Sequence, residues 1–394
     1  MTLQGKTIIL GVTGSIAAYK SAFLVRLLRK EGVEVHVVLT EEAEKFVGKA
    51  TFQALSGHPV WVNSRDYQIS GGMGHIDLVR NADMILVAPC SANTLAKIAH
   101  GLADNLLTEL ILAREIPLAL APAMNQAMWA NPVTQSNIAL LKNQEVTIYG
   151  PDIGTQACGE EGSGRLLEPA ILVELLVGFG APPILKGKQV LITAGGTEEP
   201  LDPVRALRNR SSGRMGVALA RACRNVGANV TVVYGLMSVD LPYGINAVKA
   251  ESAEAMYNAV HAHLSDKDIF ISVAAVADFR PKEIEREKIK RQEKDKLLLE
   301  LVPNPDILAS VAKLKDAPFC VGFAAESEKI VEYGQMKRQR KGVPLLIAND
   351  VKKNMDMEKG SVYIIGPVGI EEIHHQDKDA IARHIVKTIA SLIN

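Results

Sequence analysis

Short apolar runs rich in branched residues alternate with helix-like patterns along the whole chain. Runs of this kind lie at 7–14, 33–40, 83–89, 118–123, 146–150, 189–196, 229–235, 268–275, 319–325, 344–350 and 361–366. Strands that are apolar on both faces and separated by helices are typical of parallel sheets with helices on both sides. The pattern therefore predicts an α/β fold built from doubly wound, mainly parallel, Rossmann-like sheets.

The pattern is interrupted at 178–188, where glycines and paired prolines follow an apolar helical stretch and precede a new strand. A chain of 394 residues is long enough for two or three domains of about 100–200 residues each. We expect two domains, 1–180 and 187–394, each opening with a strand, a glycine turn and a helix. The first of these helices is predicted over Ile16–Arg29.

Composition narrows the class of partner. The chain has 44 basic and 44 acidic residues, so its formal net charge is zero and nothing favours nucleic acid or an anionic membrane. No stretch approaches the roughly 20 apolar residues of a membrane span, and the first residues lack the pattern of a signal peptide. We therefore expect a cytoplasmic protein with small-molecule ligands.

The four cysteines are far apart and include no Cys-x-x-Cys pair, so neither a disulfide framework nor a zinc finger is indicated. One of them, Cys158, lies in the run "ACGEEGSGR" (157–165). Spacing alone leaves open whether it is a packing residue or a reactive thiol. The three glycines of this run favour a flap that folds over a ligand, because a core cysteine needs none.

Polar residues follow the first and third apolar runs. Gly14 and Ser15 form a turn before a helix, where free backbone N–H groups suit a phosphate, although such a turn can also be a simple connection. Ser91, Asn93 and Thr94 begin the next helix and are equally good helix caps. Because the carboxyl ends of parallel strands meet at one edge of a sheet, both groups are expected at a ligand site.

Two further residues carry candidate chemistry in this half. His75 follows a glycine-rich loop and is either structural or catalytic. Asn125 ends a strand in the sequence Pro-Ala-Met-Asn, as a helix cap or as an amide that holds a carboxylate.

Five stretches in this half, "GVTGSIAAYK", "GHIDL", "APCSANTLAKIAHGLADNLL", "PAMNQAMW" and "ACGEEGSGR", occur in this order. In them the chain resembles the flavin-dependent cysteine decarboxylases, most closely the phosphopantothenoylcysteine decarboxylase domain, over about residues 1–180. The resemblance implies a homo-oligomeric fold of that family with FMN as cofactor. It implies FMN contacts from Gly14, Ser15, Thr40, Ser91, Asn93 and Thr94. It further implies that His75 acts at the flavin, that Met124 and Asn125 hold the substrate carboxylate, and that Cys158 donates a proton from a flap.

The implied chemistry explains these residue types. Loss of CO2 from an N-acylated cysteine leaves a carbanion without an electron sink, and a flavin creates that sink by oxidising the thiol-bearing carbon. A final proton is then needed on carbon. A thiol with an ordinary pKa near 8.5 can donate it, and a flap would keep water out.

The second half has its own set of polar loops. A turn at 195–197 leads into an arginine-rich segment that ends in Ser211, Ser212 and Gly213 before a helix, which suits phosphate groups but is also an ordinary cap. Asp278 ends an apolar strand and could bind a ribose hydroxyl or a cation. The charged run at 282–300 is typical of a solvated surface, and its lysines could also close over a triphosphate. No Gly-x-x-x-x-Gly-Lys-Ser/Thr motif is present, which excludes an ordinary P-loop.

These elements resemble the phosphopantothenate–cysteine ligase domain, which in bacteria is fused behind such a decarboxylase, over about residues 187–390. The resemblance implies a CTP site formed by Ser272, Val273, Ala274, Asp278, Lys288, Asn304, Pro305, Asp306, Ile307, Phe323, Lys337 and Lys341. We prefer Lys288 over Lys290 as the triphosphate contact and assign Mg2+ to Asp278. Arg205, Ser211 and Ser212 are assigned to substrate, and Asn209 to the activated acyl intermediate.

The combined resemblance predicts an enzyme that joins cysteine to 4'-phosphopantothenate through an acyl-CMP intermediate and then decarboxylates the product to 4'-phosphopantetheine. It also predicts a homo-oligomer, with trimeric decarboxylase contacts and dimeric ligase contacts that could combine into a dodecamer. Two alternatives are a regulatory binding subunit without catalysis and a flavin prenyltransferase. The presence of His75, Asn125 and Cys158 argues against the first, and the second would need neither the ligase half nor the run at 157–165.

Overall fold

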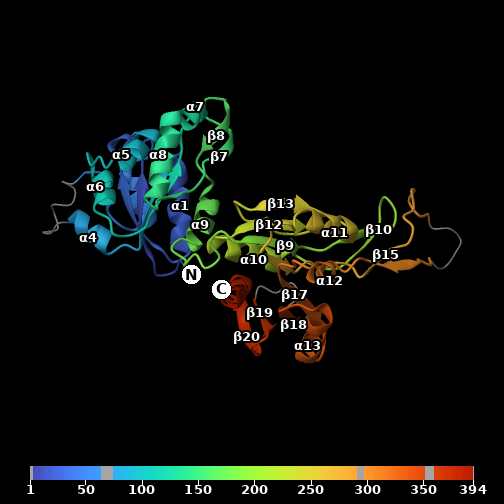
Figure 1. Cartoon of the computed structure of the whole chain (residues 1–394). Helices are drawn as coiled ribbons and strands as arrows, with labels where there is room; N and C mark the ends of the chain where they lie inside the picture. The colour runs from blue at the N-terminus through green and yellow to red at the C-terminus, as the bar shows by residue number, and fades with distance from the viewer. Residues whose placement is uncertain (1–2, 64–73, 291–296, 351–358, 394) are drawn as a thin grey trace. The chain divides into compact units, whose positions relative to one another are not determined.

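The computed structural model describes residues 3–63, 74–290, 297–350 and 359–393. The chain divides into two compact units, Met1–Gly180 and Ala181–Asn394 (Figure 1). Each unit is built on a sheet whose central strands are almost entirely buried.

The first unit contains a fully parallel sheet of six strands in the order β3-β2-β1-β4-β5-β6. The strands are β1 (Thr7–Val12), β2 (Glu34–Leu39), β3 (Val60–Trp61), β4 (Met84–Cys90), β5 (Leu118–Pro122) and β6 (Thr147–Ile148). This order is that of a doubly wound fold, in which ligands bind beyond the carboxyl ends of the strands.

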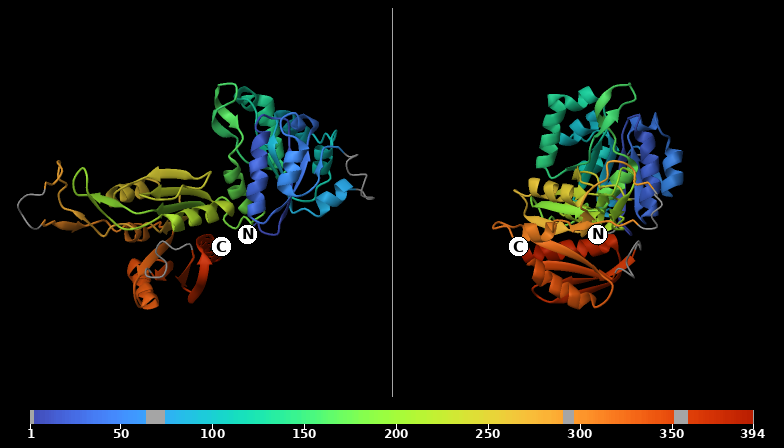
Figure 2. Two further views of the ribbon diagram at one scale, coloured as in Figure 1. Left: turned by 180° about the vertical axis from the view of Figure 1, so that it is seen from behind. Right: turned by 90° about the vertical axis from the view of Figure 1, so that its right-hand side faces the viewer.

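Helices cover both faces of this sheet, as the views in Figures 1 and 2 show. One face carries α1 (Ala18–Lys30), α3 (Lys49–Ser56) and α9 (Pro169–Val177), and the other carries α4 (Gly74–Arg80), α5 (Ala92–Ala99), α6 (Leu106–Leu112) and α8 (Pro132–Asn143). The shorter elements are α2 (Glu41–Glu44), α7 (Gln126–Ala130) and the antiparallel hairpin β7 (Asp152–Thr155) and β8 (Glu161–Arg165). The helix expected from Ile16 begins two residues later, at Ala18.

The second unit contains an eight-stranded sheet in the order β13-β12-β9-β14-β17-β18-β19-β20. Its parallel strands are β9 (Gln189–Ala194), β12 (Asn229–Tyr234), β13 (Asn246–Lys249), β14 (Ile269–Ser272), β17 (Phe319–Glu326) and β18 (Leu345–Asp350). The last two, β19 (Lys359–Ile365) and β20 (Ile370–Asp377), are antiparallel. The six parallel strands therefore repeat the order of the first unit, and an antiparallel pair extends the sheet.

Two hydrophobic cores cover the two faces of this sheet. One forms under α10 (Arg214–Asn225) and α15 (Lys378–Ile393), and the other under α11 (Ala253–Ala262), α12 (Ile307–Ala312) and α13 (Ile330–Lys341). Two small antiparallel pairs lie outside the sheet: β10 (Glu198–Pro200) with β11 (Ala206–Arg208), and β15 (Phe279–Pro281) with β16 (Leu301–Pro303).

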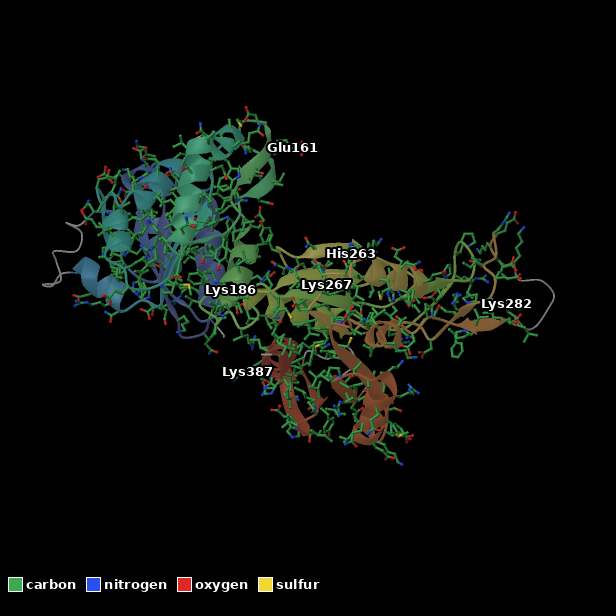
Figure 3. All side chains as sticks on the ribbon, viewed as in Figure 1. Glu161, Lys186, His263, Lys267, Lys282 and Lys387 are labelled. Atoms are coloured by element: carbon green, nitrogen blue, oxygen red, sulfur yellow. The ribbon has the colours of Figure 1, made fainter. Side chains whose placement is uncertain are left out.

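The predicted α/β class with mainly parallel, doubly wound sheets is confirmed, and every apolar run named above contains a strand. The runs did not reveal β3, β13 or β20, which are short or exposed and lack a continuous apolar stretch. Charged side chains such as Lys282 and Lys387 lie on the outside of the ribbon (Figure 3). In the described part of the chain, no helix combines the length and the apolar character needed to cross a membrane.

Candidate active sites

A cavity of about 680 Å³ lies at the carboxyl edge of the first sheet, beneath the β7–β8 hairpin. It brings together loops that are far apart in the sequence. Six residues that the sequence analysis singled out line it, namely Gly14, Ser15, Ser91, Met124, Asn125 and Cys158. The sequence analysis did not single out several other lining residues, among them Tyr19, Lys20 and Gln156.

The glycine turn of this cavity is shaped by close packing. A Cβ on Gly14 would lie 2.6 Å from the Cβ of Glu42, so any side chain there would displace α2. The Ser15 hydroxyl accepts a hydrogen bond from the Ala17 backbone N–H at 3.3 Å, just before α1 begins. The turn thus opens onto the N-terminal end of a 13-residue helix, a setting that favours an anion.

The polar residues after β4 act as helix caps in this structure. Ser91 caps α5, and its hydroxyl accepts from the Thr94 N–H at 3.3 Å and contacts the Thr94 hydroxyl at 3.2 Å. Thr94 is buried, Asn93 is exposed, and neither lines the cavity. Thr40 caps α2 through the Ala43 N–H and does not line it either. Of this group, the geometry places Ser91 alone at the cavity wall, and the cofactor contacts of all four residues stay predictions.

Asn125 and Cys158 meet across the cavity. Asn125 caps α7 with its side-chain oxygen, which accepts from the Ala127 N–H at 2.8 Å. Its Nδ2 faces the hairpin turn, 2.7 Å from Glu160 Oε2, 3.4 Å from Gln156 Oε1 and 3.5 Å from Cys158 Sγ. The Asn125 amide therefore caps α7 with its oxygen and points its nitrogen toward the thiol.

Gln156 and Glu160 flank Cys158 in this cluster. The Gln156 N–H donates to the Glu160 carbonyl at 2.7 Å, which closes the turn. Gln156 Oε1 also accepts from the Gln126 N–H at 3.1 Å, which ties the turn to the start of α7. The signal for both residues in the sequence is their position within two residues of the cysteine.

The four cysteines have different environments. Cys90, Cys223 and Cys320 are buried, whereas Cys158 is exposed at the cavity. Burial raises the pKa of the Cys90 thiol well above its usual range and the pKa of Cys223 and of Cys320 to about 12. These three thiols stay protonated and enclosed, so Cys158 is the thiol available for chemistry.

The glycines of the hairpin permit close approach. A Cβ on Gly164 would lie 2.2 Å from the Met124 carbonyl oxygen, and one on Gly162 would lie 2.1 Å from Gln126 Oε1. The Met124 N–H donates to the Gly164 carbonyl at 2.9 Å. The glycines therefore hold β8 against the segment that carries Asn125. His75 is the second residue of α4, and its side chain lies outside the described part of the structure.

A second cavity, of about 380 Å³, lies at the carboxyl edge of the second sheet. The predicted residues that line it are Asn209, Ser211, Ser212, Val273, Ala274, Asp278, Phe323 and Lys337. Arg210 and Arg214 also line it. Ser272, the last residue of β14, directly precedes the lining segment but does not itself line the cavity.

The loop before α10 forms one wall of this cavity. Gly213 has φ 76°, and a Cβ there would lie 2.6 Å from Met237 Cγ. The Ser211 hydroxyl accepts from the Gly213 N–H at 3.3 Å, and α10 begins at the next residue, Arg214. Arginines beside the N-terminal end of a 12-residue helix form an anion-binding wall.

Lys337 and Asp278 supply charges of opposite sign to the cavity. Burial is the main reason that the pKa of Lys337 is lowered, and the neighbouring Lys341 and Arg340 lower it further. Glu326 and Asp278 act in the opposite direction. Lys337 is thus a half-buried cation whose neighbours carry charges of both signs.

The predicted residues after β16 adjoin this cavity without lining it. Asn304 holds the segment by donating its backbone N–H to the Asp278 carbonyl and its Nδ2 to the Ala277 carbonyl, both at 2.8 Å. Asp306 caps α12 and forms an ion pair with Lys341. Pro305 and Ile307 lie between and after these residues. The segment that carries these residues is joined to the cavity by the hydrogen bond from Asn304 to Asp278, which lines the cavity.

Lys288 and Arg205 lie elsewhere in the second unit. Both are exposed, and neither lines the cavity. The Ile289 N–H donates to Asp202 at 3.0 Å, and Arg205 lies 3.9 Å from the same carboxylate, so both segments gather around Asp202. Their assigned contacts with triphosphate and substrate stay predictions.

Comparison with known proteins gives full-length matches. Residues 1–180 match the flavoprotein family, and residues 185–393 match the family described as DNA/pantothenate metabolism flavoprotein C-terminal domain. The coenzyme A biosynthesis bifunctional protein of Vibrio vulnificus (strain YJ016) is 45% identical over 397 residues, covering 100% of this chain and 99% of the relative. That of Escherichia coli (strain K12) is 45% identical over 357 residues, covering 90% and 88%. A crystal structure of the C-terminal domain of such a protein covers 54% of this chain and 98% of its own, with 35% identity and a TM-score of 0.47.

Proposed function

The chain belongs to the family of bifunctional coenzyme A biosynthesis proteins, and from this premise we propose how its two activities are divided between its two units. It is an enzyme with phosphopantothenate–cysteine ligase and phosphopantothenoylcysteine decarboxylase activities. Residues 1–180 carry the decarboxylase and residues 187–394 the ligase. The separate cavity at the carboxyl edge of each sheet supports this division.

The first unit is a flavoprotein, and its cofactor in this proposal is FMN. The cavity volume of about 680 Å³ falls within the range of small-molecule sites. The turn at Gly14 and Ser15, which opens onto α1, suits the phosphate, and Ser91 at the wall adds a hydroxyl. Thr40, Asn93 and Thr94 complete the assigned FMN contacts.

The decarboxylase residues divide the remaining work. When bound, FMN supplies the oxidation that makes the thiol-bearing carbon an electron sink and the hydride that is returned after CO2 has left. Asn125 Nδ2 donates to the substrate carboxylate, a role supported by the Glu160 carboxylate that it already contacts at 2.7 Å. Cys158 then protonates carbon, and the hairpin excludes water. Met124 lines the substrate site and His75 acts at the flavin.

The ligase cavity suits a nucleotide triphosphate, which we assign as CTP. The phosphopantothenate carboxylate attacks the α-phosphate and pyrophosphate leaves; the cysteine amine then displaces CMP from the acyl phosphate. Lys337 and the N-terminal end of α10 stabilise the negative charge on the leaving pyrophosphate. Mg2+ held by Asp278 would neutralise the triphosphate, since Mg2+ prefers carboxylate and phosphate oxygens. Asn209, whose Nδ2 donates to the Val276 carbonyl at 3.0 Å, faces the acyl intermediate.

The single observation that carries the decarboxylase assignment is the exposed Cys158 thiol, 3.5 Å from Asn125 Nδ2 in the cavity. We expect Cys158→Ser to release CO2 but to accumulate the oxidised enethiol, because the proton donor is lost after decarboxylation. Chromatography of the products checks this, with pyrophosphate release by the ligase unit as the internal control. Formation of reduced 4'-phosphopantetheine at the wild-type rate would remove Cys158 from the step.

The choice between Lys288 and Lys290 is tested in the same way. If Lys288 reaches the triphosphate, Lys288→Gln slows pyrophosphate release from CTP by about tenfold, as expected for the loss of one charged hydrogen bond. Lys290→Gln, also exposed and two residues away, is the matched control. Equal rates in the two variants would contradict the assignment.

We also propose that the chain forms a homo-oligomer, with trimeric contacts of the decarboxylase unit and dimeric contacts of the ligase unit. Ile16, Tyr19 and Phe23 support this, because they are 61%, 52% and 54% exposed at the start of α1. Ile16 and Tyr19 also line the cavity, so a second copy packed there would complete its wall. Light scattering of the full chain measures the number of copies; a monomer would contradict the proposal.

A further inference from the structure

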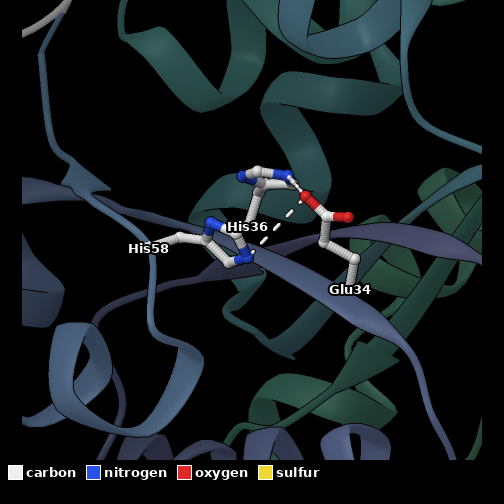
Figure 4. A group of neighbouring side chains, drawn as sticks. All are labelled: Glu34, His36 and His58. Carbon is white, nitrogen blue, oxygen red and sulfur yellow. Dashed lines mark hydrogen bonds and ion pairs between the residues drawn. The ribbon is translucent and has the colours of Figure 1, made fainter.

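Two histidines and one glutamate form a cluster on the first unit, away from its cavity (Figure 4). Glu34 begins β2 and His36 follows two residues later, so both side chains point to the same face of the sheet. His58 lies just before β3, which pairs with β2 through Val37 and Val60. The cluster is therefore at the amino end of β2, whereas the cavity lies beyond the carboxyl ends of the strands.

The three side chains converge on one point. Glu34 Oε1 lies 3.1 Å from His36 Nε2 and 3.7 Å from His58 Nε2. One ligand atom from each residue lies within 4.8 Å of the other two. The centroids of the His36 and His58 rings are 4.6 Å apart. Ligand atoms bound at about 2.0–2.2 Å around a tetrahedral zinc ion are separated by roughly 3.3–3.6 Å. Small side-chain rotations would bring all three atoms to that spacing.

The backbone holds both imidazoles in place. His36 is in the interior of β2, opposite Ile9 of the neighbouring strand, and its ring stacks on Trp61 with centroids 5.8 Å apart. His58 follows Gly57, which ends α3 at φ 76°. The buried Ser56 hydroxyl accepts from the His58 N–H at 3.2 Å. Rigid placement of ligands reduces the entropy lost when an ion binds.

The hydrogen bonding of the His36 ring is incomplete. Within the described residues, His36 Nδ1 is buried without a hydrogen-bond partner, unlike the nitrogens of a fully satisfied structural histidine.

We propose that His36, His58 and Glu34 form a site for one divalent cation of the zinc class, bound by two imidazole nitrogens and one carboxylate oxygen. Nitrogen ligands select zinc and its transition-metal neighbours over Mg2+ and Ca2+. The Glu34 side chain is 52% exposed, which leaves a fourth position open to water. The ion joins β2 to the segment before β3 and stabilises the first unit. The proposal is independent of the division of activities between the units.

The test is zinc binding to the full chain after removal of bound metal by a chelator. The Cys158→Ser background excludes the exposed thiol as a competing ligand. A chromogenic chelator reports the affinity, and Co2+ in place of zinc reports a tetrahedral site by its visible absorption. We expect one equivalent of tightly bound zinc that excess Mg2+ does not displace. Loss of an outer-shell partner of a metal ligand lowers metal affinity by about 10–100-fold. The His36→Gln/His58→Gln double variant removes two ligands, so its zinc affinity should fall by at least this much.

His263→Gln is the matched control, because it removes an exposed histidine from the second unit and leaves the cluster intact (Figure 3). Flavin absorbance and pyrophosphate release report whether each variant is folded. Glu34→Gln changes an exposed side chain and keeps both imidazoles. Its zinc affinity, which should also fall, tests the proposal if the double variant does not fold. Absence of tight zinc binding in the parent protein, or equal affinity in parent and cluster variants, would overturn the proposal.

Discussion

The two units share a strand order and differ in the loops at the carboxyl edge of their sheets. Each has six parallel strands in the doubly wound order and a glycine turn after its first strand. In the first unit, a hairpin inserted after β6 carries a thiol that faces the Asn125 amide. In the second unit, arginines, a lysine and a helix N-terminus surround the cavity. The shared sheet order places the site, and the loops decide which substrate it accepts.

The cations at the two sites are used differently. In the first unit, Lys20 and Arg165 at the cavity both contact Glu168, at 2.6 and 3.4 Å. In the second unit, burial lowers the pKa of Lys337, which has two basic and two acidic neighbours. Arg210 and Arg214 add cationic side chains beside the start of α10 in the second cavity, a setting that favours the triphosphate proposed there.

The largest expected effect is on the first unit alone. Asn125→Ala should reduce CO2 release from supplied phosphopantothenoylcysteine by about 100-fold, because the proposed donor to the reacting carboxylate is lost. Asn131→Ala is the matched control: Asn131 caps α8 in the same way, through the Val133 N–H at 2.9 Å, but does not line the cavity. Pyrophosphate release should be unchanged in both variants. A similar loss of CO2 release in both variants would reduce Asn125 to a helix cap.

The converse variant affects the second unit. Lys337→Gln should slow pyrophosphate release by roughly 10–100-fold, since the proposed triphosphate site loses a cation, while decarboxylation of supplied substrate continues. The control is Lys329→Gln, an exposed lysine that directly precedes the same helix and pairs with Glu332. If decarboxylation fell together with ligation in Lys337→Gln, the assignment of separate sites to the two units would be wrong.

A smaller effect is expected from the hairpin backbone. Gly164→Ala should destabilise the first unit by about 1–3 kcal/mol, because both the φ of 152° and the nearby Met124 oxygen oppose a side chain. Gly101→Ala, with φ 68° and ordinary van der Waals contact at 3.9 Å, isolates the conformational part of the cost. Thermal unfolding of both variants measures the difference. Equal midpoints would show that the hairpin does not depend on close approach at Gly164.

The sequence predicted the fold class because buried parallel strands have continuous apolar sequences. It also placed Gly14, Asn125 and Asp278 near strand ends. Cavity positions such as Gln156 and Lys20 were not predicted, because their roles depend on contacts between segments far apart in the chain. The cluster of Glu34, His36 and His58 was missed for the same reason: the histidines lie 22 positions apart in the chain, and pairing of β2 with β3 brings them together. Lys288 is the opposite case. The resemblance assigns it a contact with the triphosphate, whereas its side chain is exposed and does not line the cavity.

Each unit encloses hydrophobic cores of its own. Heat denaturation of this chain is therefore better described as two cooperative events than as one all-or-none transition, and a single melting temperature would not define its stability. A ligand held by one unit shifts the transition of that unit by mass action. Calorimetry with flavin, nucleotide or zinc added separately would resolve which transition each compound moves, and so assign each ligand to its unit without any measurement of turnover.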